Sequence, residues 1–282
     1  MKKDIKIVTD GSCDFPQEIL DRIDVDIVSL NVSFEDETFV AGVEIDDTAF
    51  YEKMRKSPKL PHTSSPSPDR FMETFRNENH EELLVITLSE KLSSTYSNAV
   101  LAKQLFEEED DSKRIEVVDC KTGSVAAALI VLKCSEMIQE GKSLDEILVE
   151  LERMKEHVVL YGVLDTIENA VKGGRINPIA GQLINVLNYK VLVKVEDGLV
   201  KPFDKARGDV NSIKKLMSHV GKAIGDSTSR RIAIAHSNCP EKVERVKKYI
   251  EEQFKVKETF VTKIGPIMGT YAAERAILIS IL

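Results

Sequence analysis

Two loops crowded with hydroxyl groups hold the side chains of this chain that could best do chemistry. The first reads His62-Thr63-Ser64-Ser65-Pro66-Ser67, and the second reads Leu92-Ser93-Ser94-Thr95-Tyr96-Ser97. Hydroxyl groups and the free backbone N–H groups at the start of a helix favour an anionic head group. No strong base, metal-ligand cluster or phosphate-binding loop stands beside them in the sequence. The two loops therefore predict a site that holds a carboxylate rather than one that breaks a bond.

Each hydroxyl cluster also has an ordinary structural explanation. Ser67 alone accounts for a turn and a helix N-cap in the first loop. Thr63 and Ser64 exceed what a cap requires, so we expect them to bind a ligand. In the second loop, one hydroxyl must cap the next helix, and Ser93 and Ser94 stay open between capping and ligand binding.

His62 next to Thr63 raises the alternative of a nucleophile activated by a histidine. Neighbouring residues of an extended segment point to opposite sides, so we expect that His62 does not reach the Thr63 hydroxyl. The chain also lacks the G-x-S-x-G motif of many hydrolases. Asp10 and Asp14 could bind a metal, but such acids more often cap and turn the chain. The sequence therefore predicts no catalytic residue and no metal site.

The composition indicates a globular protein without a nucleic-acid partner. The chain has 282 residues, 42% hydrophobic and 30% charged, which is enough for two domains. Its net charge of −8 disfavours phosphate backbones. Cys13, Cys120, Cys134 and Cys239 are scattered without metal-ligand spacing, which favours reduced thiols and no zinc.

The sequence predicts a cytoplasmic protein without a membrane span. The longest apolar run, residues 125–132, is far shorter than the roughly 20 residues that cross a bilayer. The first residues lack the apolar core of a signal peptide. A transient contact with a membrane surface is compatible with these observations.

Alternating strands and helices position the hydroxyl loops in the first half of the chain. Four apolar runs predict strands, at residues 5–9, 25–30, 83–88 and 115–118. Helix signals stand at Asp46-Asp47, Ser67-Pro68-Asp69, about Ser94, residues 123–140 and Ser143-Leu144-Asp145-Glu146. In the helix from about Ser94, the residues expected to face inward are Tyr96, Val100 and Leu101. This alternation predicts a Rossmann-like N-terminal α/β domain with a parallel sheet, residues 1–158, in which the loop after 83–88 lies where ligands bind.

The pattern changes after residue 158, where we expect a second domain, residues 159–282. Asp197-Gly198 predicts a β-hairpin turn between strands 189–195 and 199–203. Two helix and strand pairs follow, at 209–224 with 231–236 and at 240–253 with 256–263. A further helix is expected to start at Asn177-Pro178, and residues 265–282 read as a glycine-bearing loop with an apolar end. Hairpins do not occur in a purely parallel sheet, so this domain is expected to have a mixed sheet.

Two arginines are further candidates with two interpretations each. Arg175 follows Lys172-Gly173-Gly174, which reads either as a helix C-cap with dipole-complementing cations or as structural support or a partner contact. Arg207, in Lys205-Ala206-Arg207-Gly208, is either a surface cation or part of a patch for an acidic partner.

Taken together, these segments resemble the DegV family of bacterial fatty-acid-binding proteins. The matching segments, in chain order, are Thr9-Asp10-Gly11-Ser12-Cys13-Asp14, Thr63-Ser64-Ser65-Pro66-Ser67, Leu92-Ser93-Ser94-Thr95-Tyr96, Val117-Val118-Asp119, Lys172-Gly173-Gly174-Arg175-Ile176, Ala206-Arg207 and Ile264-Gly265-Pro266. The resemblance implies two α/β domains with a long-chain fatty acid between them. It implies a carboxylate held by Thr63, by Ser93 and by the backbone N–H of Ser94. It also implies a non-enzymatic carrier without a cofactor, which presents the fatty acid to a separate kinase that forms an acyl phosphate, with Arg207 on the kinase-facing surface.

The tail of the chain departs from the family pattern. Where the family commonly has Gly-x-His-x-Gly-Pro-Gly, this chain has Gly269-Thr270-Tyr271-Ala272-Ala273-Glu274-Arg275. Tyr271 replaces the histidine and can still donate a hydrogen bond to the carboxylate, but it cannot become a cation. Glu274 near an anion requires a screening cation. Ser65 and Ser94 replace a glutamine and a glycine.

Two other functions stay open at this point. The first is a small-molecule phosphotransferase or hydrolase, by kinship with the substrate domains of dihydroxyacetone kinases, and the second is a regulator that binds another amphiphile. The sequence determines neither the acyl chain, the kinase nor the oligomeric state.

Overall fold

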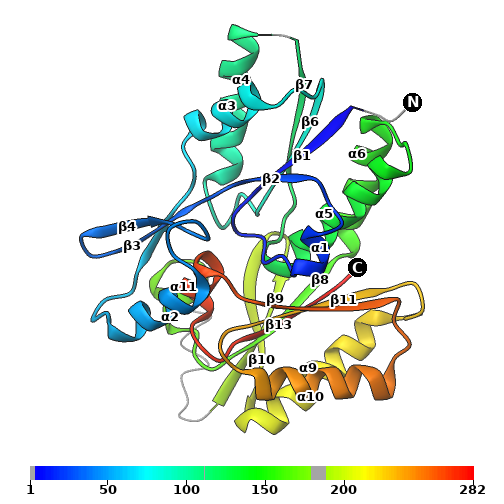
Figure 1. The fold of residues 1–282 in the computed structure, drawn as a ribbon. Helices are drawn as coiled ribbons and strands as arrows, with labels where there is room; N and C mark the ends of the chain where they lie inside the picture. Colours follow the sequence, from blue (N-terminus) through cyan, green and yellow to red (C-terminus); the bar gives the residue numbers. More distant parts are fainter. Residues whose placement is uncertain (1–3, 111, 179–188) are drawn as a thin grey trace.

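Three β-sheets organise the chain in its computed structural model, which describes residues 4–110, 112–178 and 189–282 (Figure 1). The first sheet has the order β2-β1-β6-β7 and is parallel throughout. Its strands are β1 (Ile5–Asp10), β2 (Val25–Val28), β6 (Glu82–Thr87) and β7 (Arg114–Asp119). The predicted α/β class and parallel sheet are confirmed.

The second sheet has six strands and is mixed, as predicted. Its order is β10-β9-β8-β13-β11-β12, with a parallel β11–β12 pair and antiparallel pairs elsewhere. The strands are β8 (Val159–Leu164), β9 (Tyr189–Glu196), β10 (Leu199–Arg207), β11 (Arg231–His236), β12 (Glu258–Lys263) and β13 (Ile277–Ile281). The turn of the β9–β10 hairpin is Asp197-Gly198, with φ values of 53° and 75°, the left-handed geometry that such a two-residue turn requires.

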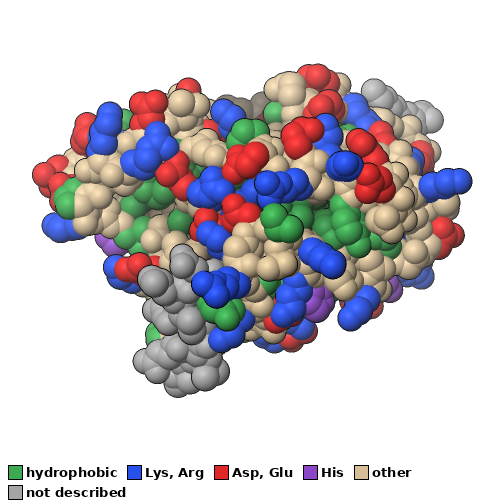
Figure 2. Space-filling model, turned by 90° about the horizontal axis from the view of Figure 1, so that it is seen from below, with side chains coloured by type: hydrophobic (Ala, Val, Ile, Leu, Met, Phe, Trp, Pro, Cys, Tyr) green, Lys and Arg blue, Asp and Glu red, His purple; other side chains and the backbone are tan. Residues whose placement is uncertain are grey.

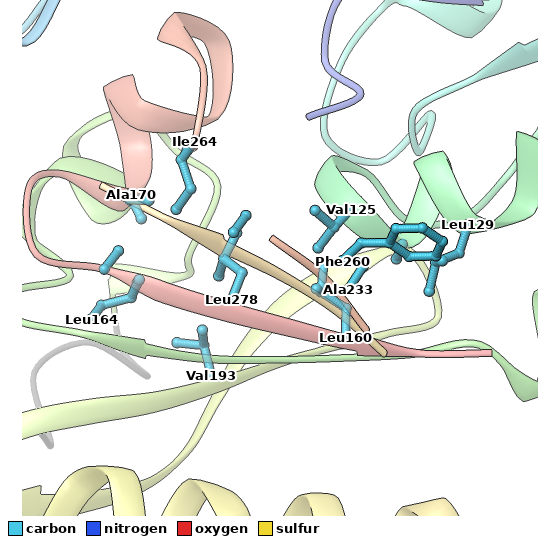
Figure 3. Close-up of a cluster of buried hydrophobic side chains, with 14 of the residues drawn as sticks. Val125, Leu129, Leu160, Leu164, Ala170, Val193, Ala233, Phe260, Ile264 and Leu278 are labelled. Atoms are coloured by element: carbon cyan, nitrogen blue, oxygen red, sulfur yellow. The ribbon is translucent and has the colours of Figure 1, made fainter. Parts of the chain in front are cut away.

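Helix α5 (Ser124–Gln139) lies between the two large sheets. One of its faces, with Val125 and Leu129, packs against Leu160 and Leu278 of the six-stranded sheet, and Figure 3 shows this cluster. Its other face, which includes Ile130, packs against the parallel sheet. A helix that is apolar all round must be buried on all sides, which explains the apolar run at its start.

Four further helices cover the outer faces of the two large sheets, and a fifth packs beside α5. They are α3 (Pro68–Asn77) and α4 (Thr95–Glu109) on the parallel sheet, α6 (Leu144–His157) beside α5, and α9 (Gly208–Ile224) and α10 (Pro240–Gln253) below the mixed sheet (Figure 1). The predicted capping box of α6 is present, because the Ser143 side chain accepts from the Glu146 N–H and the Glu146 side chain accepts from the Ser143 N–H.

A small third sheet was not predicted. Strands β3 (Asn31–Phe34), β4 (Glu37–Val40) and β5 (His62–Ser64) pair in the antiparallel order β4-β3-β5. It packs against α2 (Asp47–Lys56), whose cap Asp46 accepts from the Ala49 N–H at 2.8 Å, as predicted. The first hydroxyl cluster therefore begins in a strand, not in a loop.

Two further expectations were wrong. In α4, the buried residues are Thr95, Ala99, Ala102 and Phe106, whereas Leu101 is 44% exposed. The small side chains recur at helical spacing and allow close packing, so they form the inner face. The glycine-bearing tail is also not a loop throughout, because it forms helix α11 (Pro266–Ala272).

Two short helices, α1 (Gln17–Leu20) and α7 (Glu168–Lys172), complete the described elements. The helix predicted to start at Asn177-Pro178 runs into residues 179–188, which lie outside the described residues. Within the described part of the chain, no helix is both long and apolar enough to span a bilayer.

Candidate functional site

A mainly apolar pocket lies between the parallel sheet and the mixed sheet. The empty space in this pocket amounts to about 860 Å³, a figure that includes open solvent at its mouth. The apolar wall from the first half of the chain includes Leu30, Leu88 and Leu92. The apolar wall from the second half includes Leu160, Leu164, Val193, Val195, Val200, Met268 and Leu278. The pocket therefore lies between segments of the two halves, at the carboxyl end of β6, where the sequence predicted a ligand, and also at that of β7.

Two of the polar residues of the pocket, Thr63 and Arg175, contact Tyr271 on α11. The Tyr271 hydroxyl lies 2.7 Å from Oγ1 of Thr63 on β5. The Arg175 guanidinium carbon lies 4.4 Å from the centre of the Tyr271 ring, a cation–π contact. Gly173 on the C-terminal side of α7 allows this arrangement, since an added Cβ would lie 2.4 Å from Cε1 of the ring. Segments more than 200 residues apart thus place two hydroxyls and one cation together.

Arg175 is a half-buried cation without a carboxylate partner among the described residues. Its Nε donates to the Leu92 carbonyl at 3.1 Å and its Nη1 donates to the Gly173 carbonyl at 2.6 Å. Carbonyl groups orient the guanidinium but do not neutralise its charge. A partly desolvated charge without a counter-ion favours an anion nearby, so this end of the pocket attracts a carboxylate.

The second hydroxyl loop leads into the N-terminus of α4. The Ser93 hydroxyl lines the pocket and accepts from the Thr95 N–H at 3.3 Å. Among the described residues, the Ser94 N–H has no hydrogen-bond acceptor, whereas its hydroxyl lies 2.6 Å from the Ser65 hydroxyl. The Ser94 amide thus stays available at the positive end of a 15-residue helix, which is a favourable position for an anion.

Three other candidate residues lie away from these groups. Ser64 is exposed, with its hydroxyl 3.4 Å from the Asn31 amide nitrogen, and Arg207 is exposed at the end of β10. Neither lines the pocket. His62 is exposed on β5, whereas its neighbour Thr63 faces the pocket, as the alternation of a strand predicts.

The altered tail directs its charges away from the pocket. Glu274 forms an ion pair with Arg55 of α2 and accepts from the Asn238 side chain at 3.0 Å. Arg275 pairs with Asp209 at 2.8 Å and with Glu241 at 3.0 Å. The screening cation that Glu274 requires is therefore Arg55. The replaced glycines leave Ala273 and Arg275 at positive φ, 60° and 64°.

Asp14 is a buried carboxyl group directly beneath the pocket wall. It accepts from the Gly265 N–H at 2.7 Å and from the Ser124 hydroxyl, and Ser124 itself lines the pocket. Burial raises the pKa of Asp14 to about 7, although both hydrogen bonds lower it. Because Gly265 precedes α11, this carboxyl joins the first half of the chain to the helix that carries Tyr271.

Among the polar residues of the pocket that sequence reasoning missed are Ser124 and Lys194. The run Lys121-Thr122-Gly123-Ser124 follows β7 at the carboxyl end of a parallel strand, so the rule that located Ser93 could have found Ser124. Lys194 lies on a hairpin strand and pairs with Glu196. No signal in the sequence marks it.

Comparisons with known proteins match the whole chain. The family model described as an uncharacterised protein of the DegV family matches residues 4–282. A DegV family protein from Ruminococcus gnavus, solved with vaccenic acid, is 29% identical with a TM-score of 0.91, covering 98% of this chain and 99% of that one. A fatty-acid-binding DegV family protein from Thermus thermophilus is 27% identical with a TM-score of 0.90, covering 98% of both chains. The Fatty Acid Kinase B3 protein from Streptococcus pneumoniae, loaded with linoleic acid, is 25% identical with a TM-score of 0.88, again covering 98% of both.

Proposed function

Because this chain belongs to the DegV family, we propose that it binds a long-chain fatty acid non-covalently in the pocket between its two sheets. Thr63, Ser93, the Ser94 N–H and Tyr271 hold the carboxylate, and Arg175 neutralises it. The observation that carries this proposal is the half-buried Arg175 guanidinium, which lacks a carboxylate partner among the described residues and lies beside two hydroxyls at a mainly apolar pocket. The similar proteins that were solved with vaccenic acid and linoleic acid support the ligand class.

The hydroxyl pair provides a ready hydrogen-bond donor for the carboxylate. When Thr63 and Tyr271 bond to each other, one of the two O–H groups is used and the other stays free. A carboxylate accepts from both at once, and hydrogen bonds to a charged group contribute about 1.5–3 kcal/mol each.

The acyl chain supplies most of the binding free energy. About 14 buried methylenes contribute roughly 11 kcal/mol at about 0.8 kcal/mol each, before the cost of ordering the chain. Non-covalent burial therefore suffices to retain the lipid, and the site requires no nucleophile.

We further propose that the protein is a carrier without catalytic activity of its own, and that it serves a separate kinase. The exposed Arg207 at the end of β10 is the candidate contact for that partner. The similar Fatty Acid Kinase B3 protein supports this assignment. The exposed His62, which faces away from Thr63, gives no support to a hydrolase.

We also propose that residues 1–158 and 159–282 are the two domains. The parallel sheet ends with β7 at Asp119, and the mixed sheet begins with β8 at Val159. Helix α5 packs on both, so the two units are expected to associate tightly. Native-state hydrogen exchange tests the boundary, since two domains predict separate protection patterns for the two sheets.

Native mass spectrometry of the purified protein, followed by organic extraction, tests the ligand. We expect one fatty acid per chain. An empty protein that also fails to take up added oleate or palmitate would overturn the proposal.

The site is tested by comparing oleate with its methyl ester, which keeps the acyl chain but removes the charge. The wild type is expected to prefer oleate at least tenfold. Thr63→Val combined with Ser93→Ala should abolish most of that preference, whereas the matched control Thr38→Val, on β4, should keep it. An unchanged preference in the double variant would show that the head group binds elsewhere.

A further inference from the structure

A second pocket, the waist pocket, is walled mainly by cations from both halves of the chain. Its basic residues are Lys133 of α5, Arg153 and His157 of α6, Arg230 and Arg231 at the start of β11, and Lys257 before β12. Leu282, the chain end marked C in Figure 1, also lines it. In that view, α11 with the fatty-acid site lies on the left and the marked end lies on the right. The two pockets share no lining residue.

Some of these cations are already neutralised. Arg231 is buried and donates to Glu136 at 2.6 and 2.8 Å and to Glu258 at 2.7 Å. Its charge is thus neutralised, and its side chain only forms part of the pocket wall. Arg153 lies 3.5 Å from Glu150, the acidic side chain at the pocket. Because both arginines are paired with carboxylates, they define the shape of the pocket and add little net positive charge to it.

Three cations of the waist pocket lack an ion pair within the described ranges. They are Lys133, Arg230 and Lys257, from three separate segments. The backbone holds two of them together, because the Lys257 N–H donates to the Arg230 carbonyl at 2.8 Å. Positive charges that line one pocket repel one another, and an anion bound between them reduces that repulsion.

The waist pocket differs from the face of the molecule that Figure 2 shows. There, acidic and basic side chains are interspersed. On α10, for example, Lys248 lies 3.8 Å from Glu252. In a chain with a net charge of −8, a pocket lined by six basic side chains and one acidic side chain requires a specific explanation.

We propose that the waist pocket binds a phosphate group, carried either by a small phosphate compound or by an anionic phospholipid head group. A phosphate dianion presents three oxygens in different directions, which matches cations that arrive from three segments. A single carboxylate has only two oxygens and one charge. This site is independent of the fatty-acid pocket, and oleate binding reports separately on that pocket.

The test uses the full chain and two charge-matched double variants. Arg230→Gln with Lys257→Gln removes two unpaired cations from the waist pocket. Lys214→Gln with Lys222→Gln removes two exposed cations from α9, where they lie away from both pockets. Calorimetric titration with inorganic phosphate and with glycerol 3-phosphate measures the small ligands. Sedimentation with phosphatidylglycerol vesicles, against phosphatidylcholine vesicles, measures the lipid source.

We expect saturable binding of at least one phosphate source, weakened at least tenfold in the waist-pocket variant and less than twofold in the α9 variant. Binding of the small ligands alone assigns a free phosphate compound. Binding to phosphatidylglycerol vesicles, competed by inorganic phosphate, assigns the head group. Equal weakening in both variants would mean long-range attraction without a site, and no saturable binding of either source would also overturn the proposal. Normal oleate binding in the waist-pocket variant shows that it is folded and that a failure here leaves the fatty-acid proposal intact.

Discussion

Replacing Asp14 by Asn should stabilise the protein above neutral pH. Burial raises the pKa of this carboxyl from 3.8 to about 7, so the folded state binds the proton more tightly than the unfolded state does. The contribution of Asp14 to stability is therefore greatest below pH 4, falls as the pH rises towards 7, and then levels off. Each pKa unit is worth about 1.4 kcal/mol, so the ionised Asp14 costs on the order of 4 kcal/mol at pH 8.

An asparagine at position 14 avoids that cost while it keeps both contacts. Its carbonyl oxygen accepts from the Gly265 N–H, and its amide donates to the Ser124 hydroxyl. We expect Asp14→Asn to match the wild type near pH 4 and to exceed it by up to about 4 kcal/mol at pH 8.

Urea unfolding from pH 4 to pH 8 measures this difference. The two proteins differ only at position 14, so the difference between the two stability curves reports mainly on Asp14. Asp36→Asn, an exposed position in the β3–β4 turn, should follow the wild type at every pH. A difference that does not grow between pH 4 and pH 8 would refute the reasoning, because Asp14 would then ionise normally in its buried position.

Three further substitutions test the site and the contact between the two halves. Tyr271→Phe keeps the ring but removes the hydroxyl near Thr63, so oleate affinity should fall about tenfold in a fluorescent competition assay. An unchanged affinity would show that this hydroxyl does not bind the carboxylate. Gly173→Ala places a methyl group against the Tyr271 ring and should weaken oleate binding at unchanged stability, whereas unaltered affinity would show that the ring can move freely. Glu136→Gln leaves the buried Arg231 without its bidentate partner and should lower the free energy of unfolding by about 3 kcal/mol in urea, and a loss below 1 kcal/mol would contradict this.

Features with local causes could be predicted from the sequence. The Asp46 cap, the capping box at Ser143 and the Asp197-Gly198 turn each depend on side chains within a few residues. The parallel and mixed sheets followed from the alternation of such elements. Short-range hydrogen bonds and turn geometry act before the chain is compact, so the sequence reveals them directly.

Features without a local cause were missed. The β3–β4 hairpin turns at Glu35-Asp36, which lacks the Asn-Gly or Asp-Gly signal, although Glu35 takes a positive φ of 45°. The inner face of α4 consists of small residues such as Ala99 and Ala102, which a search for large apolar side chains passes over. Helix α11 starts at Pro266 amid glycines and becomes stable only by packing against its neighbours.

The candidate site likewise has features that follow from the sequence and features that only the tertiary structure decides. The sequence by itself determined which residue types are present, since excess hydroxyls at Thr63 and Ser93 and the lack of a strong base nearby indicate carboxylate binding. Only the tertiary structure decided that Tyr271 lies 2.7 Å from Thr63 and that Arg175 lacks a carboxylate partner among the described residues. Sequence spacing cannot encode these contacts, because they depend on how α7, α11 and β5 pack across a pocket. The charge on a side chain is local, whereas its neutralisation depends on neighbours that folding brings from distant parts of the chain.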